Sequence, residues 1–281
     1  MNGVVMLKTL YQPRDIPMQV AVFMSRKGTN AIKLLEHERD RGRHGYTISC
    51  LVTDNSKKGN NSLEIADCFR LPQPIYSDFD LFRLEHITDP KNMAERKPYF
   101  RALMERISTV QPRIDCIALA GYELIVTEPL LGKFTGRIVN IHPSNLGLRN
   151  AEGKPLFPGS HAVRNAILAG ESEIRASTHL VINGVDEGPV LVVSKPVKVV
   201  LSDGLTLEDL RRRENRSLAT AIAGQHQDEL KMVGDWIIYP LTLELMARGA
   251  FSRDERGTIY LRDEPIPNGA TFEAAQKALE A

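Results

Sequence analysis

The sequence predicts an α/β fold with one doubly wound, mostly parallel open sheet, a C-terminal helical segment and a small β-hairpin. Two observations indicate this class. Short runs such as residues 20–24 and 114–120 are apolar nearly throughout, as parallel strands buried on both faces are. Segments with helical periodicity lie between these runs, and such alternation is typical of a parallel sheet covered by helices.

The elements follow one another in this alternating order. The first expected strand, residues 20–24, leads through a small polar loop into a helix over residues 31–37. A later strand includes Ile138, Val139 and Ile141 and stops before Pro143, because proline lacks the backbone donor that a further ladder bond needs. The remaining expected strands are 46–53, 74–76 and 114–120, together with 177–182 and 190–200, which pair as a long hairpin. The other expected helices are 63–69, 90–110, 127–134, 163–168 and 205–248, and the last of these is broken at Gly224 or Gly234. A small hairpin is expected over residues 251–261.

Composition and charge describe an ordinary globular chain. We expect a main domain over residues 18–250, an N-terminal extension over residues 1–17, and a hairpin and tail over residues 251–281. With 36 Lys and Arg against 35 Asp and Glu, no overall field attracts nucleic acid or a membrane surface. The chain has no run of roughly 18 apolar residues and no signal peptide, so a cytoplasmic location is expected. Cys50 and Cys116 lie in apolar runs and are expected in the core.

The strongest candidate site is the strand end that carries Asn140 and His142. Residues two apart on a strand point to the same face, so an amide and an imidazole project together. In open α/β sheets, ligands bind at the carboxyl ends of the strands. We interpret the two residues as a catalytic pair, with Asp186 in the later turn as its third member. This set suits general acid–base chemistry assisted by an amide donor.

The loop after the first strand is a candidate anion site. Gly28 lets the backbone approach a ligand, Thr29 and Asn30 add donors, and Arg26 and Lys27 add positive charge before a helix N-terminus. An ordinary turn between strand and helix is the alternative. The loop lacks the Gly-x-Gly-x-x-Gly fingerprint, and the chain has no Walker pattern, so the sequence favours a small phosphate over a dinucleotide.

Other polar residues are weaker candidates. His161 and His179 fall in segments that flank the strand end and the Asp186 turn, whereas His226 is expected at the surface. No histidine or glutamate pair has the helical spacing of a metal site, and the cysteine spacing is wrong for zinc, so no metal is expected. Ser144 and Ser160 do not lie in a nucleophile elbow, which disfavours covalent catalysis.

Four motifs carry a resemblance to a known family: Asn140-Ile-His142-Pro-Ser, Pro158-Gly-Ser-His161, Ser177-x-His179 and Val185-Asp186-x-Gly188-Pro189. Together they closely resemble the folate-dependent formyltransferases. Within that family the chain is most similar to the glycinamide ribonucleotide transformylases. The resemblance extends over residues 20–249 with insertions, and it implies a Rossmann-like formyltransferase domain.

The resemblance implies an activity and a role for each catalytic residue. The activity is transfer of a formyl group from 10-formyltetrahydrofolate to the primary amine of glycinamide ribonucleotide, in purine biosynthesis. Asn140 would donate to the formyl oxygen as that oxygen gains charge. His142 would manage the proton that moves from the amine towards the folate nitrogen. Asp186 would hold a water and favour the protonated imidazole.

The resemblance also implies binding residues. It places the phosphate of the ribonucleotide on Gly28, Thr29 and Asn30. It places the ribose hydroxyls on Asp235, where the family has a Glu, although Asp235 is also explained as a residue that starts a helix. The implied folate contacts are Gly121, Tyr122, Ile125, Val126, Asn183, Gly184 and Val185, and the implied supporting residues of the catalytic group are His161, Ser177 and His179.

Departures from the family leave the acceptor open. Arg26-Lys27, Glu123-Leu124 and the long loop from Gly147 to Pro155 differ from its pattern. The alternatives are a 10-formyltetrahydrofolate hydrolase, an enzyme that formylates an amino sugar nucleotide or methionyl-tRNA, and a non-catalytic folate-binding protein. The hydrolases carry an N-terminal domain for which this chain has no room. The tail after Gly249 is too short and too acidic for RNA binding. Expected partners are therefore the small-molecule substrates. The sequence leaves the oligomeric state open, with a homodimer as one alternative.

Overall fold

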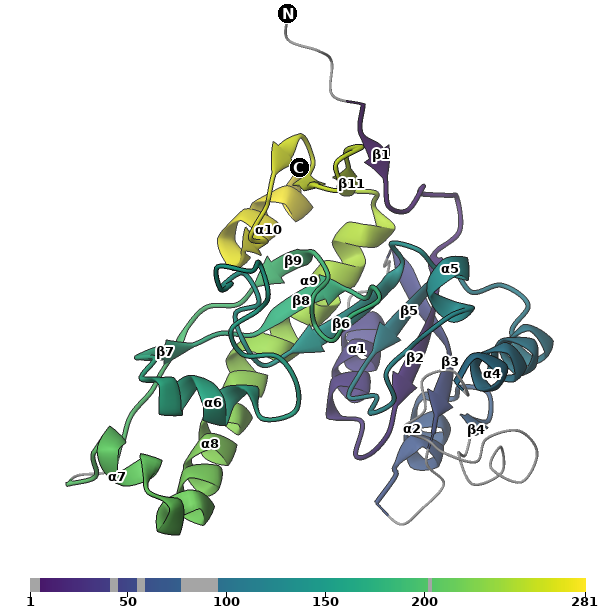
Figure 1. Ribbon diagram of the computed structural model, residues 1–281. Coiled ribbons are helices and arrows are strands. Elements are labelled where there is room, and N and C mark those ends of the chain that lie inside the picture. The colour runs from purple at the N-terminus through teal and green to yellow at the C-terminus, as the bar shows by residue number, and fades with distance from the viewer. Residues whose placement is uncertain (1–5, 41–44, 55–58, 77–95, 202–203) are drawn as a thin grey trace, which may run out of the picture.

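The structure is a computed structural model (Figure 1) that describes residues 6–40, 45–54, 59–76, 96–201 and 204–281. The expected start of a helix at residues 90–95 lies outside these ranges. The main sheet has eight strands in the order β14-β9-β8-β6-β5-β2-β3-β4. Their bounds are β2 (Met18–Met24), β3 (Tyr46–Thr53), β4 (Ile75–Tyr76), β5 (Cys116–Leu119), β6 (Ile138–His142), β8 (Ser177–Leu180), β9 (Val190–Val193) and β14 (Ala270–Thr271).

Every neighbouring pair in this sheet is parallel except β6–β8 and β8–β9. This confirms the mostly parallel open sheet. The helices are α1 (Thr29–Asp40), α2 (Ser62–Phe69), α4 (Arg96–Val110), α5 (Leu130–Lys133), α6 (Ala162–Ala169), α7 (Leu207–Arg211), α8 (Arg216–Leu230), α9 (Trp236–Ala247) and α10 (Phe272–Glu280), with a 3₁₀ turn η1 (Arg213–Asn215) and a π turn η2 (Lys231–Asp235).

The core lies on both faces of the sheet, and β2 shows how the sequence achieves this. Its residues Val20, Val22 and Met24 belong to the cluster under α1, α6, α8 and α9. The alternate residues Ala21 and Phe23 belong to the cluster under α4 and α5. Because side chains alternate along a strand, only a continuous apolar run can supply both clusters.

The antiparallel part of the sheet is shorter than expected. The hairpin of β8 and β9 pairs as far as Ser177 and Val193. Beyond it, Pro196 precedes β10 (Val197–Lys198), which pairs with β7 (Glu173–Ile174) in a separate two-stranded sheet. The expectation of one strand over residues 190–200 is wrong. Proline has no amide hydrogen for the ladder, which is consistent with the interruption.

The C-terminal helical segment is nearly continuous from α8 to α9. Helix α8 passes through Gly224, so an expected break there is wrong. The α-helical pattern changes at η2, which contains Gly234. A Cβ on Gly234 would lie 3.2 Å from Ala176 Cβ and from Ser194 Oγ, so glycine allows the helix to approach the sheet closely at this turn. The π turn delivers Asp235 to the start of α9 in a buried position.

Both ends of the chain add strands. The expected hairpin is β11 (Phe251–Arg253) with β12 (Ile259–Leu261), and it is extended by β1 (Lys8–Thr9) and β13 (Glu264–Pro265) into a small antiparallel sheet. Strand β14 returns to the main sheet beside β9. The proposed boundaries of the extension, main domain and tail stay a prediction.

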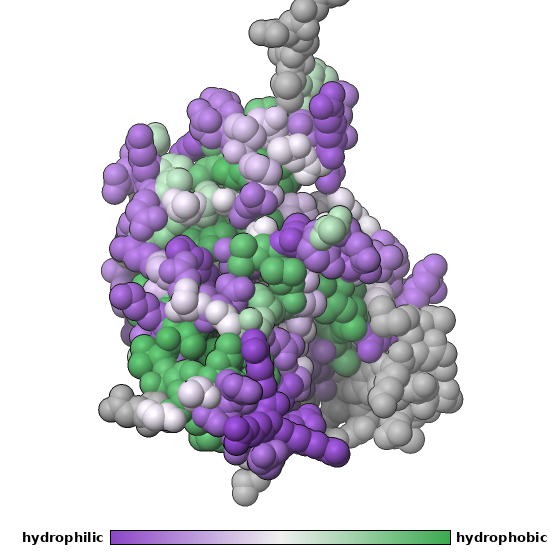
Figure 2. All heavy atoms as spheres, turned by 60° about the vertical axis from the view of Figure 1, so that its left-hand side comes forward, coloured by the Kyte–Doolittle hydropathy of each residue, from purple (hydrophilic) through white to green (hydrophobic). Residues whose placement is uncertain are grey.

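Cys50 and Cys116 are buried, as expected. On the face shown in Figure 2, hydrophilic side chains surround separate hydrophobic areas. Among the helices that the structure describes, none is long and apolar enough to cross a membrane.

Candidate functional site

The residues that carry chemistry gather over one face of the sheet at the end of β6. Val139 and Ile141 belong to the core cluster under α1 and α9, so Asn140 and His142 project from the opposite face. His179 on β8 pairs with Asn140 across the sheet. The loops that follow β6 and β8 lie in front of these strands (Figure 1) and contribute the remaining groups of the site.

His142 has a different partner at each ring nitrogen. Its Nε2 lies 3.0 Å from the carbonyl oxygen of Phe157. A carbonyl only accepts hydrogen bonds, so Nε2 carries the hydrogen and donates it. Its Nδ1 lies 3.4 Å from Oδ2 of Asp186. Nδ1 is therefore the ring nitrogen without a hydrogen in the neutral form, and it faces the carboxylate of Asp186.

His179 orients the amide of Asn140. Its Nδ1 donates to the carbonyl oxygen of Leu180 at 3.1 Å, so its neutral ring accepts at Nε2, where Nδ2 of Asn140 lies 3.1 Å away. Burial lowers the pKa of His179 to about 4, although the charge of Asp186 opposes this shift. His179 is consequently neutral near pH 7. It fixes the amide nitrogen of Asn140 towards the site and uses one of the two N–H donors of that nitrogen.

Asp186 lies in a tightly held turn between β8 and β9. Its φ of 57° is left-handed, which costs an L-residue roughly 1 kcal/mol, less for Asp than for most. Gly188 lies so close to β8 that a Cβ would be 1.7 Å from the carbonyl oxygen of Leu180. The amide of Gly159 donates to Oδ2 of Asp186 at 2.8 Å. These contacts direct the carboxylate at His142.

Ser177 supports the loop after β6, whereas His161 lies at the rim of the site. The hydroxyl of Ser177 donates to the carbonyl oxygen of Ser144 at 2.8 Å and accepts from the amide of Leu146 at 3.2 Å. His161 is exposed and directly precedes α6, two residues after Gly159. Ser177 is thus tied into the loop that holds His142, and the role of His161 stays a prediction.

A second cluster forms at the start of α1. Gly28 has a φ of 66°, and a Cβ there would lie 2.6 Å from Met24 Cε, so the loop requires glycine. Helix α1 begins at Thr29, and Nδ2 of Asn30 lies 3.5 Å from Oδ2 of Asp235. The structure therefore brings the loop and Asp235 together, although 205 residues separate Asn30 from Asp235.

The carboxylate of Asp235 is buried, and few neighbouring groups offset the loss of its hydration. Burial raises its pKa to about 6, and the hydrogen bond from Asn30 and the charge of Lys231 only partly oppose this. Within the described part of the chain, Oδ1 of Asp235, Oδ1 of Asn30 and Nε1 of Trp236 are buried without a hydrogen-bond partner. Two acceptors and one donor so placed can recognise a ligand that carries hydroxyl groups.

The expected folate contacts lie in the loops after β5 and β8. Gly121 lies two residues after the end of β5, and its carbonyl oxygen accepts from the amide of Ser25 at 3.2 Å, which ties this loop to the loop before α1. Tyr122 packs edge-on against Phe23, with its hydroxyl 3.3 Å from that of Tyr99. Ile125, Asn183, Gly184 and Val185 are exposed, whereas Val126 is buried.

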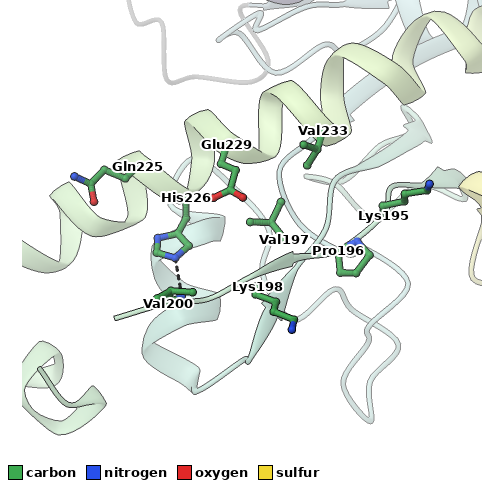
Figure 3. A pocket seen from close by; sticks show the side chains of 9 residues that line it. All are labelled: Lys195, Pro196, Val197, Lys198, Val200, Gln225, His226, Glu229 and Val233. Atoms are coloured by element: carbon green, nitrogen blue, oxygen red, sulfur yellow. Dashed lines mark hydrogen bonds between the residues drawn. The ribbon is translucent and has the colours of Figure 1, made fainter. Parts of the chain in front are cut away.

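A cavity of about 610 Å³ lies outside both clusters, between β10 and α8 (Figure 3). His226 lines it and is buried, so the expected surface position is wrong. Its Nε2 accepts from the amide of Val200 at 3.0 Å and its Nδ1 donates to the carbonyl oxygen of Ile222 at 2.9 Å. These backbone partners satisfy both ring nitrogens. Over the described ranges, no group of three or more His, Cys, Asp or Glu could hold a metal ion.

Two contributors to the site are backbone groups that residue types could not reveal. They are the carbonyl of Phe157, which accepts from His142, and the amide of Gly159, which donates to Asp186. The Pro158-Gly-Ser-His motif marks this loop in the sequence, but not which of its peptide groups face the site.

Comparisons with known proteins place the chain in a family. A family model for formyl transferases matches residues 18–222. The trifunctional purine biosynthetic protein adenosine-3 of Drosophila pseudoobscura pseudoobscura is 34% identical over 185 residues, which cover 66% of this chain and 12% of that protein. A phosphoribosylglycinamide formyltransferase of Bacillus subtilis is 28% identical over 193 residues, 69% of this chain and 85% of the relative.

The chain is also similar to a solved structure. Glycinamide ribonucleotide transformylase 1 from Symbiobacterium toebii matches with a TM-score of 0.62 and 28% identity, over 88% of this chain and 95% of that one. The chain thus spans nearly the whole bacterial enzyme but about an eighth of the trifunctional insect protein. The family match includes the Asn140, His142 and Asp186 cluster and the loop before α1, whereas Asp235 lies beyond it. The chain belongs to the formyl transferase family.

Proposed function

We propose that the protein transfers a formyl group from 10-formyltetrahydrofolate to the amine of glycinamide ribonucleotide, a step in purine biosynthesis. The observation that carries this proposal is the contact between His142 and Asp186 beside the oriented amide of Asn140. The relatives from Bacillus subtilis and Symbiobacterium toebii are named for this acceptor.

Asn140 acts on the formyl oxygen. The amine nitrogen attacks the formyl carbon, and the electrons of the C=O bond move to the oxygen. The second N–H of the Asn140 amide donates to this oxyanion, because its first N–H is held by His179. A donor aimed at developing charge stabilises the transition state more than the ground state, and its loss costs about 2.7–4 kcal/mol in other enzymes.

His142 manages the proton, directly or through a water held by Asp186. Its Nδ1 accepts the proton that the attacking amine must lose, because Nε2 already donates to Phe157. Asp186 stabilises the imidazolium at 3.4 Å. The bond from the formyl carbon to the folate nitrogen then breaks, and that nitrogen takes the proton. The products are the formylated amine and tetrahydrofolate, so atoms and charge balance.

The cluster at α1 provides the acceptor site. Backbone amides at Gly28, Thr29 and Asn30, at the start of a helix, suit the phosphate. The exposed side chain of Arg26 lies 2.5 Å from Glu123, so we assign it no phosphate contact. Asp235 accepts from the ribose hydroxyls, and this role gives a reason for a buried carboxylate that lacks full compensation. Gly121, Tyr122, Ile125, Val126, Asn183, Gly184 and Val185 are the proposed folate contacts.

Replacing Asp235 with Asn is expected to stabilise the protein while weakening acceptor binding. The folded-state pKa is about 6 and the ordinary value 3.8, so the folded state binds more protons than the unfolded state between these values. Stability therefore falls as pH rises through this window, by about 3 kcal/mol in total. The neutral amide of the Asp235→Asn variant would avoid this cost, but its NH₂ group cannot accept from a hydroxyl. Thermal unfolding at about pH 8 and about pH 4 checks the stability difference, which should vanish at the lower pH.

The acceptor affinity of this variant is measured by calorimetry, with Asp228→Asn as the control. Asp228 is 74% exposed and pairs only with Lys231 among the described groups, so neither stability nor binding should change appreciably. An Asp235→Asn protein that is less stable at about pH 8, or that binds the ribonucleotide as tightly as the wild type, would contradict the assignment.

The proposed reaction is tested by following conversion of 10-formyltetrahydrofolate to tetrahydrofolate with and without glycinamide ribonucleotide. Turnover that requires the ribonucleotide is expected. Turnover without any amine would instead indicate the hydrolase, and no turnover in either mixture would reject this donor and acceptor pair. A cytoplasmic location and a homodimer complete the proposal, and sedimentation of the purified chain tests the assembly.

A further inference from the structure

We propose that Arg149 is a positioning residue, whose guanidinium holds the turn that carries Asp186 in its active geometry. Its effect on catalysis rests on the proposed function. Its effect on the position of Asp186 does not, because that follows from contacts within the chain.

The guanidinium of Arg149 joins two loops. Its Nη2 donates to the carbonyl oxygens of Glu187 and Gly188, each at 3.3 Å. Its Nη1 donates to the carbonyl oxygen of Gly153 at 2.8 Å, inside its own loop. Hydrogen bonds from a charged donor are stronger than neutral ones, and the planar fork directs them. One side chain thus fastens the two residues that follow Asp186 to the loop after β6.

The loop that carries Arg149 is itself well defined. It folds back on itself through hydrogen bonds from the amide of Leu156 to the carbonyl of Leu148 at 3.0 Å, and from the amide of Asn150 to the carbonyl of Lys154 at 2.9 Å. This ladder places Arg149 opposite Pro155. Arg149 is half-buried, so its guanidinium is partly shielded from water.

The turn that carries Asp186 has a backbone conformation that contacts from other parts of the chain must restrain. Asp186 adopts a left-handed φ of 57°, which an L-residue rarely adopts without tertiary restraint. On the inner side, Gly188 is pressed against the carbonyl oxygen of Leu180. The fork of Arg149 bonds the carbonyl of the same glycine and that of Glu187, so both Arg149 and strand β8 restrain the turn.

The same stretch of chain also holds His142. After the hairpin of Arg149, the carbonyl of Phe157 accepts from His142 Nε2, and the amide of Gly159 donates to Asp186. The stretch therefore contacts both members of the His142–Asp186 pair. Within it, the side chain of Arg149 donates to the carbonyl oxygens of the turn.

The test compares Arg149→Met with the wild type by amide hydrogen exchange at Gly159, whose N–H reports the position of the Asp186 carboxylate. Methionine keeps much of the apolar stem but has no donors. We expect exchange at Gly159 to be about ten-fold faster, and kcat for formyl transfer to be about ten-fold lower, because small displacements of reacting groups are costly. KM for the ribonucleotide should stay the same, since its site lies at Asn30 and Asp235. Arg149→Lys can donate to only some of the three carbonyl oxygens that Arg149 contacts. Its exchange rate at Gly159 and its kcat should therefore lie between those of the wild type and of Arg149→Met.

Asn150→Ala is the matched control. The side chain of Asn150 accepts from the amides of Glu152 and Lys154 at the tip of the same loop and makes no contact with the turn. This variant should keep wild-type exchange at Gly159 and wild-type kcat. Wild-type exchange at Gly159 in Arg149→Met would overturn the proposal, even in a fully active enzyme. An inactive wild type would reject the proposed function instead, and the exchange comparison would still decide whether Arg149 positions the turn.

Discussion

Replacing His142 with Ala is expected to lower kcat for formyl transfer by about 10³-fold, while folate binding changes little. The physical reason is the loss of the imidazole ring of His142. This ring donates to the carbonyl oxygen of Phe157 at one nitrogen and faces the carboxylate of Asp186 at the other. Without it, the attacking amine loses the base that is proposed to accept its proton. Single-turnover kinetics with saturating ribonucleotide measures the loss directly.

A second variant separates chemistry from folding. His142→Ala removes one of two donors to the carbonyl of Phe157, which keeps the hydroxyl of Ser144 at 2.9 Å, so the lost hydrogen bond costs about 1 kcal/mol of stability. His142→Gln keeps a side-chain N–H donor but cannot take up a proton near neutral pH. Both variants should lose activity, and Gln should retain more thermal stability. Near wild-type kcat in either folded variant would rule out the proton-transfer role of His142.

Replacing Asn140 with Ala is expected to lower kcat by about 10²- to 10³-fold with little change in KM. The amide nitrogen of Asn140 is oriented by His179 at 3.1 Å, and its second N–H is the proposed donor to the oxyanion. Because this bond strengthens only as charge develops, its loss should affect the chemical step and not substrate binding. Steady-state kinetics over both substrates measures the two effects.

The controls for Asn140 test the donor itself. Asn140→Asp is nearly the same size but lacks the N–H groups, so its kcat should fall at least as far as that of the Ala variant. Asn165 is exposed on α6, and Asn165→Ala should behave as the wild type. A raised KM with unchanged kcat in Asn140→Ala would mean that Asn140 binds the ground state and transition state equally.

Each of the two clusters contains a buried ionisable group whose pKa is shifted by burial. His179 is kept neutral by burial, and Asp235 is forced to a raised pKa without a full set of partners. A buried ionisable group generally costs stability unless it is paired. His226 has backbone partners at both nitrogens, whereas one of the two partners of His179 is the side chain of Asn140, which the proposed reaction uses. The distinction between functional and structural histidines therefore depends on partners and not on residue type.

The parts of the fold that were predicted correctly are those governed by local periodicity. The continuous apolar run of β2, the end of β6 before Pro143, and the shared face of Asn140 and His142 all follow from the two-residue repeat of a strand. Lengths were less reliable. The strand expected over residues 190–200 stops at Val193. Of the two expected break points, Gly224 and Gly234, only Gly234 lies where the α-helix is interrupted, because turn and helix boundaries depend on neighbouring elements.

The sequence by itself determined the sheet, the residue types of the proposed catalytic group and the family resemblance, because short-range spacing and composition encode them. Only the tertiary structure decided how distant groups meet. The contacts of Asp186 with His142, of Asn30 with Asp235 and of Arg149 with the Asp186 turn depend on strand register and loop path. Packing gives a carboxylate its partners and its burial. These decide whether it orients a neighbouring side chain, as Asp186 does, or has a raised pKa, as Asp235 does. No spacing along the chain specifies these.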